Sequence, residues 1–212
     1  MYTPRAFALD DLPELHQLIQ HTRLAQLVTF GEQGLLASHL PLLLNPDEGP
    51  NGTLYGHLAK ANPQWKDLQN GGDALVIFAG AEAYVSPAFY PAKAEHGKVV
   101  PTWNYIAVHA YGQAEVFSDA ERLLGVVTAL TDRHERGRAQ PWAVSDAPAD
   151  YIEGMLKAIV GFALPIERLI GKRKLSQNRS PADIAGVREG LAASPDVRDQ
   201  TLARFIPQGV SE

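Results

Sequence analysis

Apolar residues follow two kinds of spacing along this chain. In the first 80 residues they mostly alternate with polar residues or stand in short runs, which is typical of strands. The strands predicted in this way are LAQLVTF (24–30), LLASHLPLLL (35–44), TLYGHL (53–58) and ALVIFAG (74–80). Because only one short helix is expected with them, the pattern favours a largely antiparallel sheet over a repeated βαβ unit.

The short helix is expected to begin after Asp11, whose side chain suits an N-cap. Pro13 falls in its first turn, and Glu14 stands at the capping-box position. The residues that share one face of this helix are Leu12, Leu15, Ile19 and Thr22.

The longest predicted strand is VVPTWNYIAVHAYGQAEVF (99–117), which has one aliphatic and one aromatic face. The aliphatic positions are Ile106, Val108, Ala110, Ala114 and Val116, and the aromatic positions are Trp103, Tyr105, His109 and Tyr111. Ser118 then predicts the N-cap of a second helix, with Glu121 at its third position. The apolar side of that helix is formed by Leu123, Val127 and Leu130.

Two further elements are predicted towards the C-terminus. The stretch MLKAIVGFALPIERLIGKRKL (155–175) indicates another strand, bent at Gly161 or Pro165, with a partly helical structure as the alternative. A last helix begins with Ser180 as N-cap, Pro181 at the first helical position and Asp183 at the third. Its inward-facing residues are Ile184, Val187 and Leu191.

These elements together predict the fold class. Six or seven long, curved strands with helices at their ends fit a small barrel better than an open sheet, because closure removes exposed strand edges. The expected fold is therefore mainly β (α+β), a β-barrel with peripheral helices. No loop is long enough to be a domain linker, so we expect a single domain over 1–212 with a C-terminal helical segment at about 180–205.

Composition narrows the chemistry. A chain of 212 residues, 45% of them hydrophobic, can fill one sizeable core. It has no cysteine, so disulfides, thiolate catalysis and cysteine-based zinc sites are excluded. The net charge of −5 gives no general attraction to DNA. Without an apolar run of about 20 residues or a recognisable signal peptide, we expect a cytoplasmic protein that makes no membrane contact.

The stretch LYGHLAKANPQW (54–65) changes from strand alternation to the start of a helix. Asn62 is the expected N-cap and Pro63 the first helical residue, so free N–H groups of the helix would point back towards the strand end. Lys60 adds a positive charge at the same place, and this combination can hold a phosphate group. The alternative is a capped helix beside a solvent-exposed lysine.

Two other stretches carry candidate binding groups. In PTWNY (101–105), Trp103 and Tyr105 offer flat stacking surfaces, while Thr102 and Asn104 offer hydrogen-bonding groups; the alternative is core or dimer-interface packing. KLSQNR (174–179) carries two cations, two amides and a hydroxyl and is able to bind an anion. Its alternative is a loop whose amides satisfy its own backbone.

The usual motifs of dinucleotide-binding folds, P-loop proteins and serine hydrolases are absent from the sequence. Neither GxGxxG after a strand nor GxxxxGK[ST] occurs, and no GxSxG elbow or nucleophile set is present. His39, His57 and His109 lie in three predicted strands and would form a zinc or iron site only if they met, and no paired spacing such as HExxH supports that. No metal site is therefore predicted.

The stretches ASHLPL, GHLAKANPQW, VIFAG, YVSPAFY, VPTWNY, VHAYG, AIVGF and KLSQNR, in this order, resemble the PaiB-like family of FMN-binding negative transcriptional regulators. The resemblance covers about residues 1–191. It implies a split β-barrel like that of pyridoxamine-phosphate oxidases and flavin reductases, a homodimer, and FMN bound at the subunit interface.

The resemblance also implies a set of FMN-binding residues. The turn with His57, Lys60 and Asn62 looks like the phosphate site, and the strand with Ser38 and His39 would lie beside the flavin. The segment of Thr102, Trp103 and Asn104 would border the flavin from the other subunit. The KLSQNR loop would close the site with Lys174, Ser176, Gln177 and Arg179. The Arg-Lys pair common in the phosphate turn of the oxidases is reduced here to Lys60, which implies either weaker phosphate binding or greater reliance on the N–H groups of the helix. No catalytic residue is predicted.

Two functions remain open at this point. The first is an FMN-binding repressor, although no helix-turn-helix with a basic recognition helix is recognisable, so the sequence shows no element that would contact DNA directly. The second is a flavin-dependent oxidoreductase or flavin reductase, in which the protein positions FMN and the flavin carries hydride or electrons.

Overall fold

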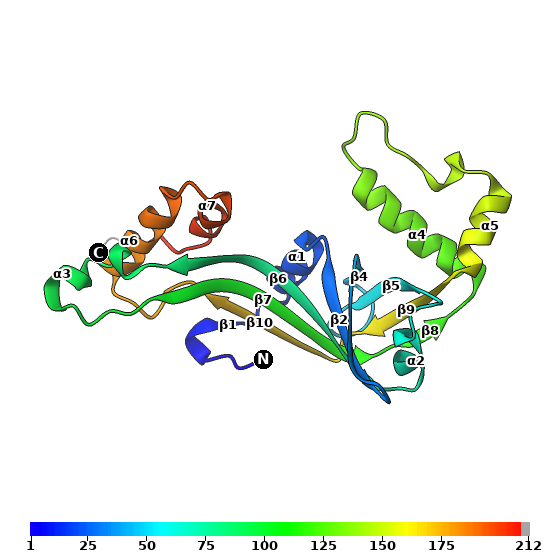
Figure 1. The fold of residues 1–212 in the computed structure, drawn as a ribbon, viewed down its shortest axis with the longest axis horizontal. Coiled ribbons are helices and arrows are strands. Elements are labelled where there is room, and N and C mark those ends of the chain that lie inside the picture. The colour runs from blue at the N-terminus through cyan, green and yellow to red at the C-terminus, as the bar shows by residue number, and fades with distance from the viewer. Residues whose placement is uncertain (209–212) are drawn as a thin grey trace. The chain divides into compact units, whose positions relative to one another are not determined.

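The structure is a computed structural model that describes residues 1–208 (Figure 1). It divides into two compact units. Unit 1 comprises Met1–Asp11, Ala79–Val108 and the described residues from Ile170 onwards, and unit 2 comprises Leu12–Phe78 and His109–Leu169. Three strands, β6 (Asp73–Val85), β7 (Thr102–Gln113) and β10 (Arg168–Lys174), contribute residues to both units. Each unit is described below by itself.

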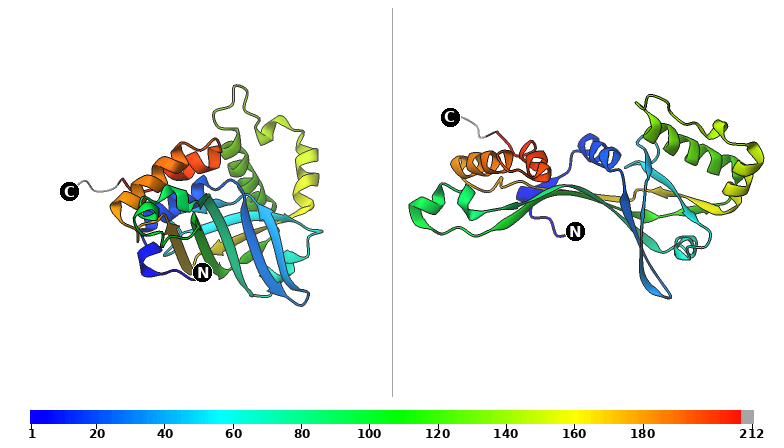
Figure 2. Two further views of the ribbon diagram at one scale, coloured as in Figure 1. Left: turned by 60° about the vertical axis from the view of Figure 1, so that its left-hand side comes forward. Right: turned by 45° about the horizontal axis from the view of Figure 1, so that its top comes forward.

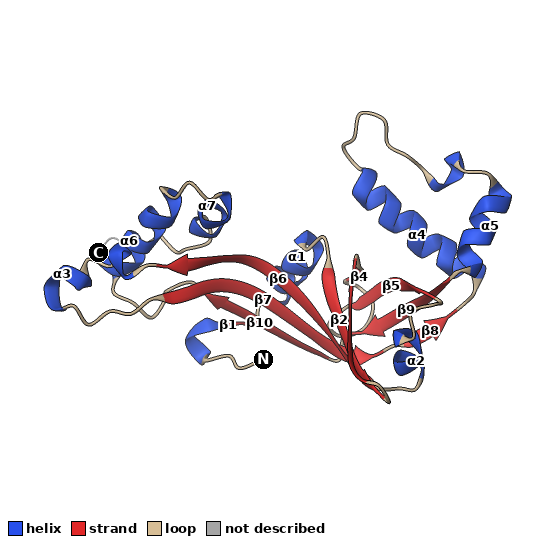
Figure 3. Ribbon diagram, in the orientation of Figure 1, coloured by secondary structure: helices blue, strands red, loops and turns tan. Residues whose placement is uncertain are grey.

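Unit 2 contains most of the strands predicted in the first 80 residues (Figure 3). Strand β2 (Ala25–Gly31) pairs with β3 (Gly34–Leu40) from Ala25↔Leu40 to Gly31↔Gly34, and on its other side with β6. A second sheet has the order β4-β5-β9-β8, all antiparallel. Its strands are β4 (Leu43–Asn45), β5 (Thr53–Ala59), β9 (Ile159–Pro165) and β8 (Glu115–Phe117).

Helices complete unit 2 on the faces of these sheets. The short helix α2 (Gln64–Gln69) follows β5, and α1 (Leu12–His21) precedes β2. Figures 1 and 2 show α4 (Ala120–Glu135) and α5 (Ala149–Lys157) on one side of the four-stranded sheet. Apolar residues of both helices and of the sheet form one cluster there: Phe117, Leu123, Val126, Leu130, Leu156 and Ala163. Burial of this cluster is the main reason why the two helices stay on the sheet.

Unit 1 contains the strand order β1-β10-β7-β6. Strand β1 (Ala8–Leu9) pairs antiparallel with β10 (Arg168–Lys174), in the register Ala8↔Lys172 and Leu9↔Gly171. The helices of this unit are α3 (Ala92–His96), α6 (Pro181–Ala192) and α7 (Val197–Ala203). Short 3-10 turns occur at Arg5–Phe7 and Pro87–Phe89 here and at Val144–Asp146 in unit 2.

Most predicted elements are confirmed. Helix α1 buries Leu15 and Ile19, as its spacing predicts. Helix α6 begins as predicted, because the hydroxyl of Ser180 accepts a hydrogen bond from the N–H of Asp183. In β7 the even-numbered face is buried, whereas the odd-numbered face is half-buried or exposed, with Trp103 53% exposed.

Several predicted boundaries are wrong, among them the strand 99–117, which is the two strands β7 and β8. The run 35–44 is two strands, because Pro41 has no N–H to continue the ladder and ends β3 beforehand. The N-cap of α4 is Asp119 and not Ser118; the Asp119 carboxylate accepts from the N–H of Arg122 at 2.8 Å. The stretch 155–175 is the end of α5 followed by the strands β9 and β10, which are separated at 166–167.

Candidate functional site

The predicted phosphate turn lies in unit 2, at the end of β5. The Asn62 amide donates to the hydroxyl of Ser38 at 2.9 Å, so these two predicted residues are in direct contact. The Asn62 carbonyl oxygen accepts from the N–H of Gln64 at 3.0 Å. The predicted N-cap is nevertheless wrong, because α2 begins at Gln64 with Pro63 as its N-cap and no side-chain cap, and the helix has only six residues. Since one of its N–H groups is already bonded, most of the anion-binding capacity of this turn rests on Lys60.

Lys60 is exposed and borders a cavity of about 330 Å³. Lys157 and Glu153, both from α5, border the same cavity. Lys157 is thus a second cation near the predicted phosphate turn. Sequence reasoning did not select it because residues 155–157 were assigned to a strand, and only recognition of the helical alternative could have placed it here.

The two histidines predicted for this site have different surroundings. His57 is half-buried, and its Nδ1 atom is enclosed without a hydrogen-bond partner. Burial lowers the pKa of His57 below its usual value, so it is neutral at pH 7. His39 is exposed and lies next to Ser38 on a strand, so the two side chains point to opposite faces of the sheet. The structure therefore groups Ser38 and Asn62 but not His39.

The other predicted residues lie in unit 1, where Lys174 is central. Its ammonium group donates to the hydroxyl of Thr102 and to the backbone oxygen of Trp103, both at 2.5 Å. The side-chain amide of Asn104 donates to the hydroxyl of Ser176 at 2.9 Å, and both of these residues are buried. Five predicted residues of β7 and the KLSQNR stretch thus form one cluster.

Two members of this loop have structural roles. Gln177 accepts a hydrogen bond from the N–H of Leu175 at 2.6 Å and donates to the backbone oxygen of Arg173 at 2.5 Å. Its amide therefore satisfies its own loop, which is the alternative considered from the sequence. Ser176 has a φ of 66°, the left-handed conformation that is uncommon for residues other than glycine. The hydrogen bond from Asn104 helps to hold this conformation.

Positive charge accumulates around Lys174. Burial, followed by the neighbouring charges of Lys172 and Arg179, lowers the pKa of Lys174 below its usual value. Lys172 is itself buried and donates to the backbone oxygen of Tyr2 at 3.0 Å. The Arg179 guanidinium lies 5.1 Å from the centre of the Tyr90 ring. Because these cations repel one another, an anion bound among them would be stabilised.

An exposed aromatic pair lies on the same unit. Trp103 and Tyr84 are 53% and 47% exposed, and their ring centres are 6.1 Å apart in an edge-to-face arrangement. Tyr84 was not selected from the sequence, although it belongs to the YVSPAFY stretch that carries part of the resemblance. Exposed rings and a cation cluster on one unit suit a ligand with a flat aromatic system and a negative group.

A metal centre is not supported in the part of the chain that the structure describes. Within residues 1–208, no three histidine, aspartate or glutamate side chains gather closely enough to hold an ion. His39, His57 and His109 therefore do not form the zinc or iron site considered from the sequence. Also within this range, no helix is long and apolar enough to cross a membrane.

Solved structures of other proteins show which class of fold this is. The chain is similar to the flavocytochrome Anf3 from Azotobacter vinelandii, with a TM-score of 0.59, 19% identity, and coverage of 81% of this chain and 72% of that one. It is also similar to the FAD and heme binding protein from Mycobacterium smegmatis, with a TM-score of 0.58, 20% identity, and coverage of 87% and 78%. The predicted fold class, an α+β split β-barrel with peripheral helices, is confirmed.

Sequence comparisons then give the family. Residues 1–168 match the family model described as "Putative FMN-binding domain", and the chain belongs to this family. It is 34% identical over 206 residues to the "Protease synthase and sporulation protein PAI 2" of Bacillus subtilis, covering 97% of this chain and 96% of that protein. An uncharacterized protein of Aspergillus fumigatus is 36% identical over 236 residues, covering 90% of each chain. The predicted resemblance and the FMN cofactor prediction agree with this family.

The residues present fit FMN. Lys174, Lys172 and Arg179 would supply positive charge for an anionic group, and Trp103 with Tyr84 would supply exposed aromatic surface. When bound, FMN would supply the capacity to transfer hydride or single electrons. The protein's own groups would bind and orient it.

Proposed function

We propose that this protein is an FMN-binding homodimer that acts as a negative transcriptional regulator of the PaiB type. The observations that carry the FMN part are the cation cluster around Lys174 and the exposed side chain of Trp103, whose backbone oxygen Lys174 contacts. An anionic, planar cofactor accounts for both features, whereas a purely structural role would require neither neighbouring like charges nor an exposed ring.

The residues proposed to contact FMN form two groups. Those in unit 2 are Ser38, His39, His57, Lys60 and Asn62, and those in unit 1 are Thr102, Trp103, Asn104, Lys174, Ser176, Gln177 and Arg179. The contacts described above support the second group most strongly, because five of its members are already held together by hydrogen bonds. In the first group, Ser38 and Asn62 are held together in the same way.

FMN titration tests this assignment. Lys174→Met keeps most of the apolar stem and removes the charge, and we expect it to weaken FMN binding by roughly 10- to 100-fold, the size of a charge-assisted contact. Lys60→Ala is expected to weaken it by about 1 to 3 kcal/mol. Lys98→Met, at an exposed position outside both groups, is the matched control and should leave the affinity unchanged.

Riboflavin, which lacks the phosphate, separates the possible outcomes. If the lysines bind phosphate, their replacement should leave riboflavin affinity unchanged. Equal losses for FMN and riboflavin would show that the substitutions disturb the flavin pocket itself. Unchanged FMN affinity in both variants would remove these lysines from the site while leaving FMN binding intact. Failure of the unaltered protein to bind FMN would refute the cofactor proposal.

The homodimer is supported by an exposed apolar pair on the β2–β3 hairpin. Phe30 and Leu35 lie directly opposite each other in this hairpin and are 72% and 73% exposed. Such a pair is better stabilised in a subunit interface than in water. Sedimentation should show a dimer, and the double variant Phe30→Ser, Leu35→Ser should shift it towards monomer. Tyr151→Ser, at an exposed tyrosine of α5, is the control; a dimer that the double variant leaves intact would exclude this surface.

The regulatory role rests on the likeness to the Bacillus subtilis protein, whose name connects it with protease synthesis and sporulation. Direct contact with DNA is not required by this proposal, because the chain has a net charge of −5. Gel retardation of promoter DNA tests for it: direct binding should weaken steeply with salt. Regulation without retardation would indicate that the effect is indirect.

A flavin-dependent oxidoreductase or flavin reductase is the second candidate. The acidic net charge favours it, because such an enzyme needs no attraction to nucleic acid. Oxidation of reduced nicotinamide by the FMN-loaded protein would support this function, and its absence would favour the regulator. A cytoplasmic location and a single domain over the whole chain stay predictions.

A further inference from the structure

A second cavity, of about 570 Å³, lies in unit 2 on the outer side of α4. Its walls come from α4, from residues 143–149 and from α5. The volume is within the range of about 300 to 1,000 Å³ that is usual for sites of small organic ligands. None of its lining residues belongs to the candidate FMN residues, so FMN binding does not account for this cavity.

The lining is mainly apolar. Leu124 of α4, Val144 of the connecting segment, and Ile152 and Leu156 of α5 supply most of the wall. Leu124 is 38% exposed, although it is a large aliphatic residue in the middle of a long helix. Covering this surface with an apolar ligand would be favourable by the hydrophobic effect.

The charged residues of the lining are both acidic. Asp132 lies eight residues after Leu124 on α4, which places the two on the same side of the helix, and Glu153 comes from α5. No ion pair involving either carboxylate is present within residues 1–208. Glu153 also borders the smaller cavity with Lys60, so Asp132 is the carboxylate that belongs to this cavity alone.

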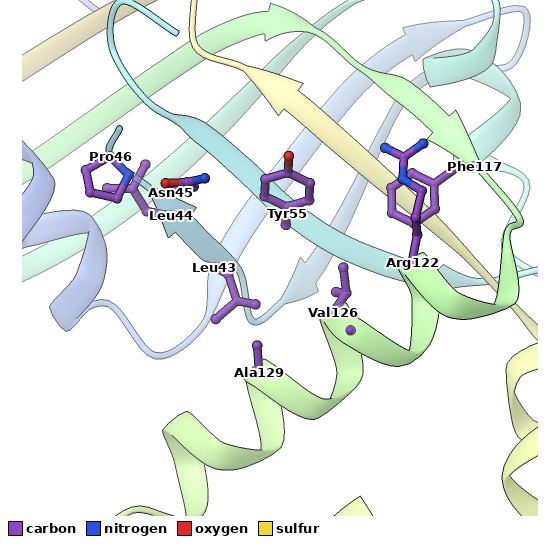
Figure 4. A pocket seen from close by; sticks show the side chains of 10 residues that line it. Leu43, Leu44, Asn45, Pro46, Tyr55, Phe117, Arg122, Val126 and Ala129 are labelled. Atoms are coloured by element: carbon purple, nitrogen blue, oxygen red, sulfur yellow. The ribbon is translucent and has the colours of Figure 1, made fainter. Parts of the chain in front are cut away.

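A third cavity, drawn in Figure 4, has polar side chains that are paired with other residues of the protein. It has about 460 Å³ and is lined by β4, β5 and α4, with Tyr55 and Arg122 as prominent polar side chains. The Tyr55 hydroxyl donates to Glu48 at 2.7 Å, and burial together with this contact raises the pKa of Tyr55 to about 12. Arg122 forms a two-point contact with Glu115. Those polar groups have partners within the protein, whereas the two carboxylates of the 570 Å³ cavity are exposed and have no ion-pair partner among residues 1–208.

We propose that the cavity between α4, residues 143–149 and α5 binds a small organic cation that carries an apolar body, such as a hydrophobic primary amine. The apolar body would cover Leu124 and Ile152, and the ammonium group would lie at Asp132 and Glu153. This site contains none of the proposed FMN contacts, although it shares Glu153 and Leu156 with the cavity that Lys60 borders. In a regulator, such a site could receive a metabolic signal.

Three probes of similar size test the charge requirement: phenethylamine, 2-phenylethanol and 3-phenylpropionate. Each is titrated into the full-length protein while backbone amide signals are followed by NMR. We expect phenethylamine to shift the signals of residues 124, 144 and 152 and to bind about fivefold or more tightly than 2-phenylethanol. The anionic probe should bind most weakly of the three.

Isosteric variants test the residues. Asp132→Asn should remove most of the preference for the amine over the alcohol while leaving alcohol binding unchanged, and Glu153→Gln should have a smaller effect. Glu121→Gln, at an exposed acid of α4 outside the cavity, is the matched control and should change neither affinity. Equal binding of the three probes, shifts outside the cavity, or an amine preference that survives the Asp132 and Glu153 double variant would each overturn the proposal.

Discussion

Arg133 of α4 offers the most direct test of how unit 2 is held together. Its guanidinium donates to the backbone oxygen of Leu42 at 2.7 Å and to the backbone oxygens of Gln20 and Thr22. The last two oxygens lie at the C-terminal end of α1, where carbonyls lack helical partners. One side chain therefore joins α4, the end of α1 and the chain between β3 and β4. Burial lowers the pKa of Arg133, which shows that its charge is partly removed from water.

The expected loss follows from these three contacts. A hydrogen bond from a charged donor contributes about 1.5 to 3 kcal/mol, and the contact with buried Leu42 should count in full. The contacts at the helix end add about 0.3 to 1 kcal/mol, since those carbonyls can return to water. Dehydration of the guanidinium offsets part of this sum. We therefore expect Arg133→Met to lower the free energy of unfolding by about 2 to 3 kcal/mol, or the melting temperature by about 4 to 12 °C.

Urea unfolding of the flavin-free protein measures this loss. Methionine keeps much of the apolar stem, so the difference reports mainly on the guanidinium. Arg136→Met is the matched control, because Arg136 is exposed at the end of the same helix. Arg133→Lys should restore only part of the stability, since an ammonium lacks the planar fork that reaches several carbonyls. A loss for Arg133→Met within about 0.5 kcal/mol of the control would refute the reasoning.

Three further outcomes are expected. Gly161→Ala should lower the free energy of unfolding by about 1 to 3 kcal/mol, because the new Cβ would lie 2.4 Å from the ring of Phe117. The new Cβ of Gly154→Ala in α5 meets no atom within 4 Å, so this substitution should raise the free energy of unfolding by about 0.5 to 1 kcal/mol. Urea midpoints of the two variants that move in the same direction would contradict this. Thr29→Val should cost about 1 to 2 kcal/mol, because the buried hydroxyl donates to a carboxylate of α2 at 2.9 Å, and an unchanged midpoint would contradict it. Because the pKa of His57 is lowered in the folded protein, the unfolded state binds a proton at a higher pH than the folded state does, and stability falls as pH drops below about 6.5. The variant His57→Gln should therefore lose less stability between pH 7 and pH 5 than the unaltered protein. Equal losses would show that His57 does not contribute to this pH dependence.

Elements with local signals were predictable from the sequence. Helix α6 is an example, because Ser180, Pro181 and Asp183 specify its start within four residues. The stretch 155–175 has no such punctuation, since apolar residues continue from α5 into β9 without glycine or asparagine at the boundary. The strand begins where pairing with β5 begins, at Ile159 opposite Ala59. That boundary is set by a partner 100 residues away, which a local pattern does not contain.

The start of α4 shows a related limit. Ser118 and Asp119 are both good N-cap residues, and the sequence offers no reason to prefer one. In the structure Asp119 caps the helix, while Phe117 is buried in the core of unit 2. A shift of the helix by one residue would rotate its apolar stripe by about 100° away from the sheet. Packing therefore decides between two caps that are locally equivalent.

Prediction of the candidate site was limited because the sequence does not show which hydrogen bonds are already made within the protein. Counting polar groups in KLSQNR showed how many hydrogen bonds the loop could make, but not which of them it already makes. The structure separates these cases: Gln177 satisfies the backbone of its own loop, whereas Lys174 is held by two oxygens and still stands among cations that disfavour its charge. The contact with Thr102 joins residues 72 positions apart, so it depends on the tertiary fold and not on any motif. A ligand-binding role is therefore better supported for Lys174 than for Gln177, although the two residues were equal candidates from the sequence.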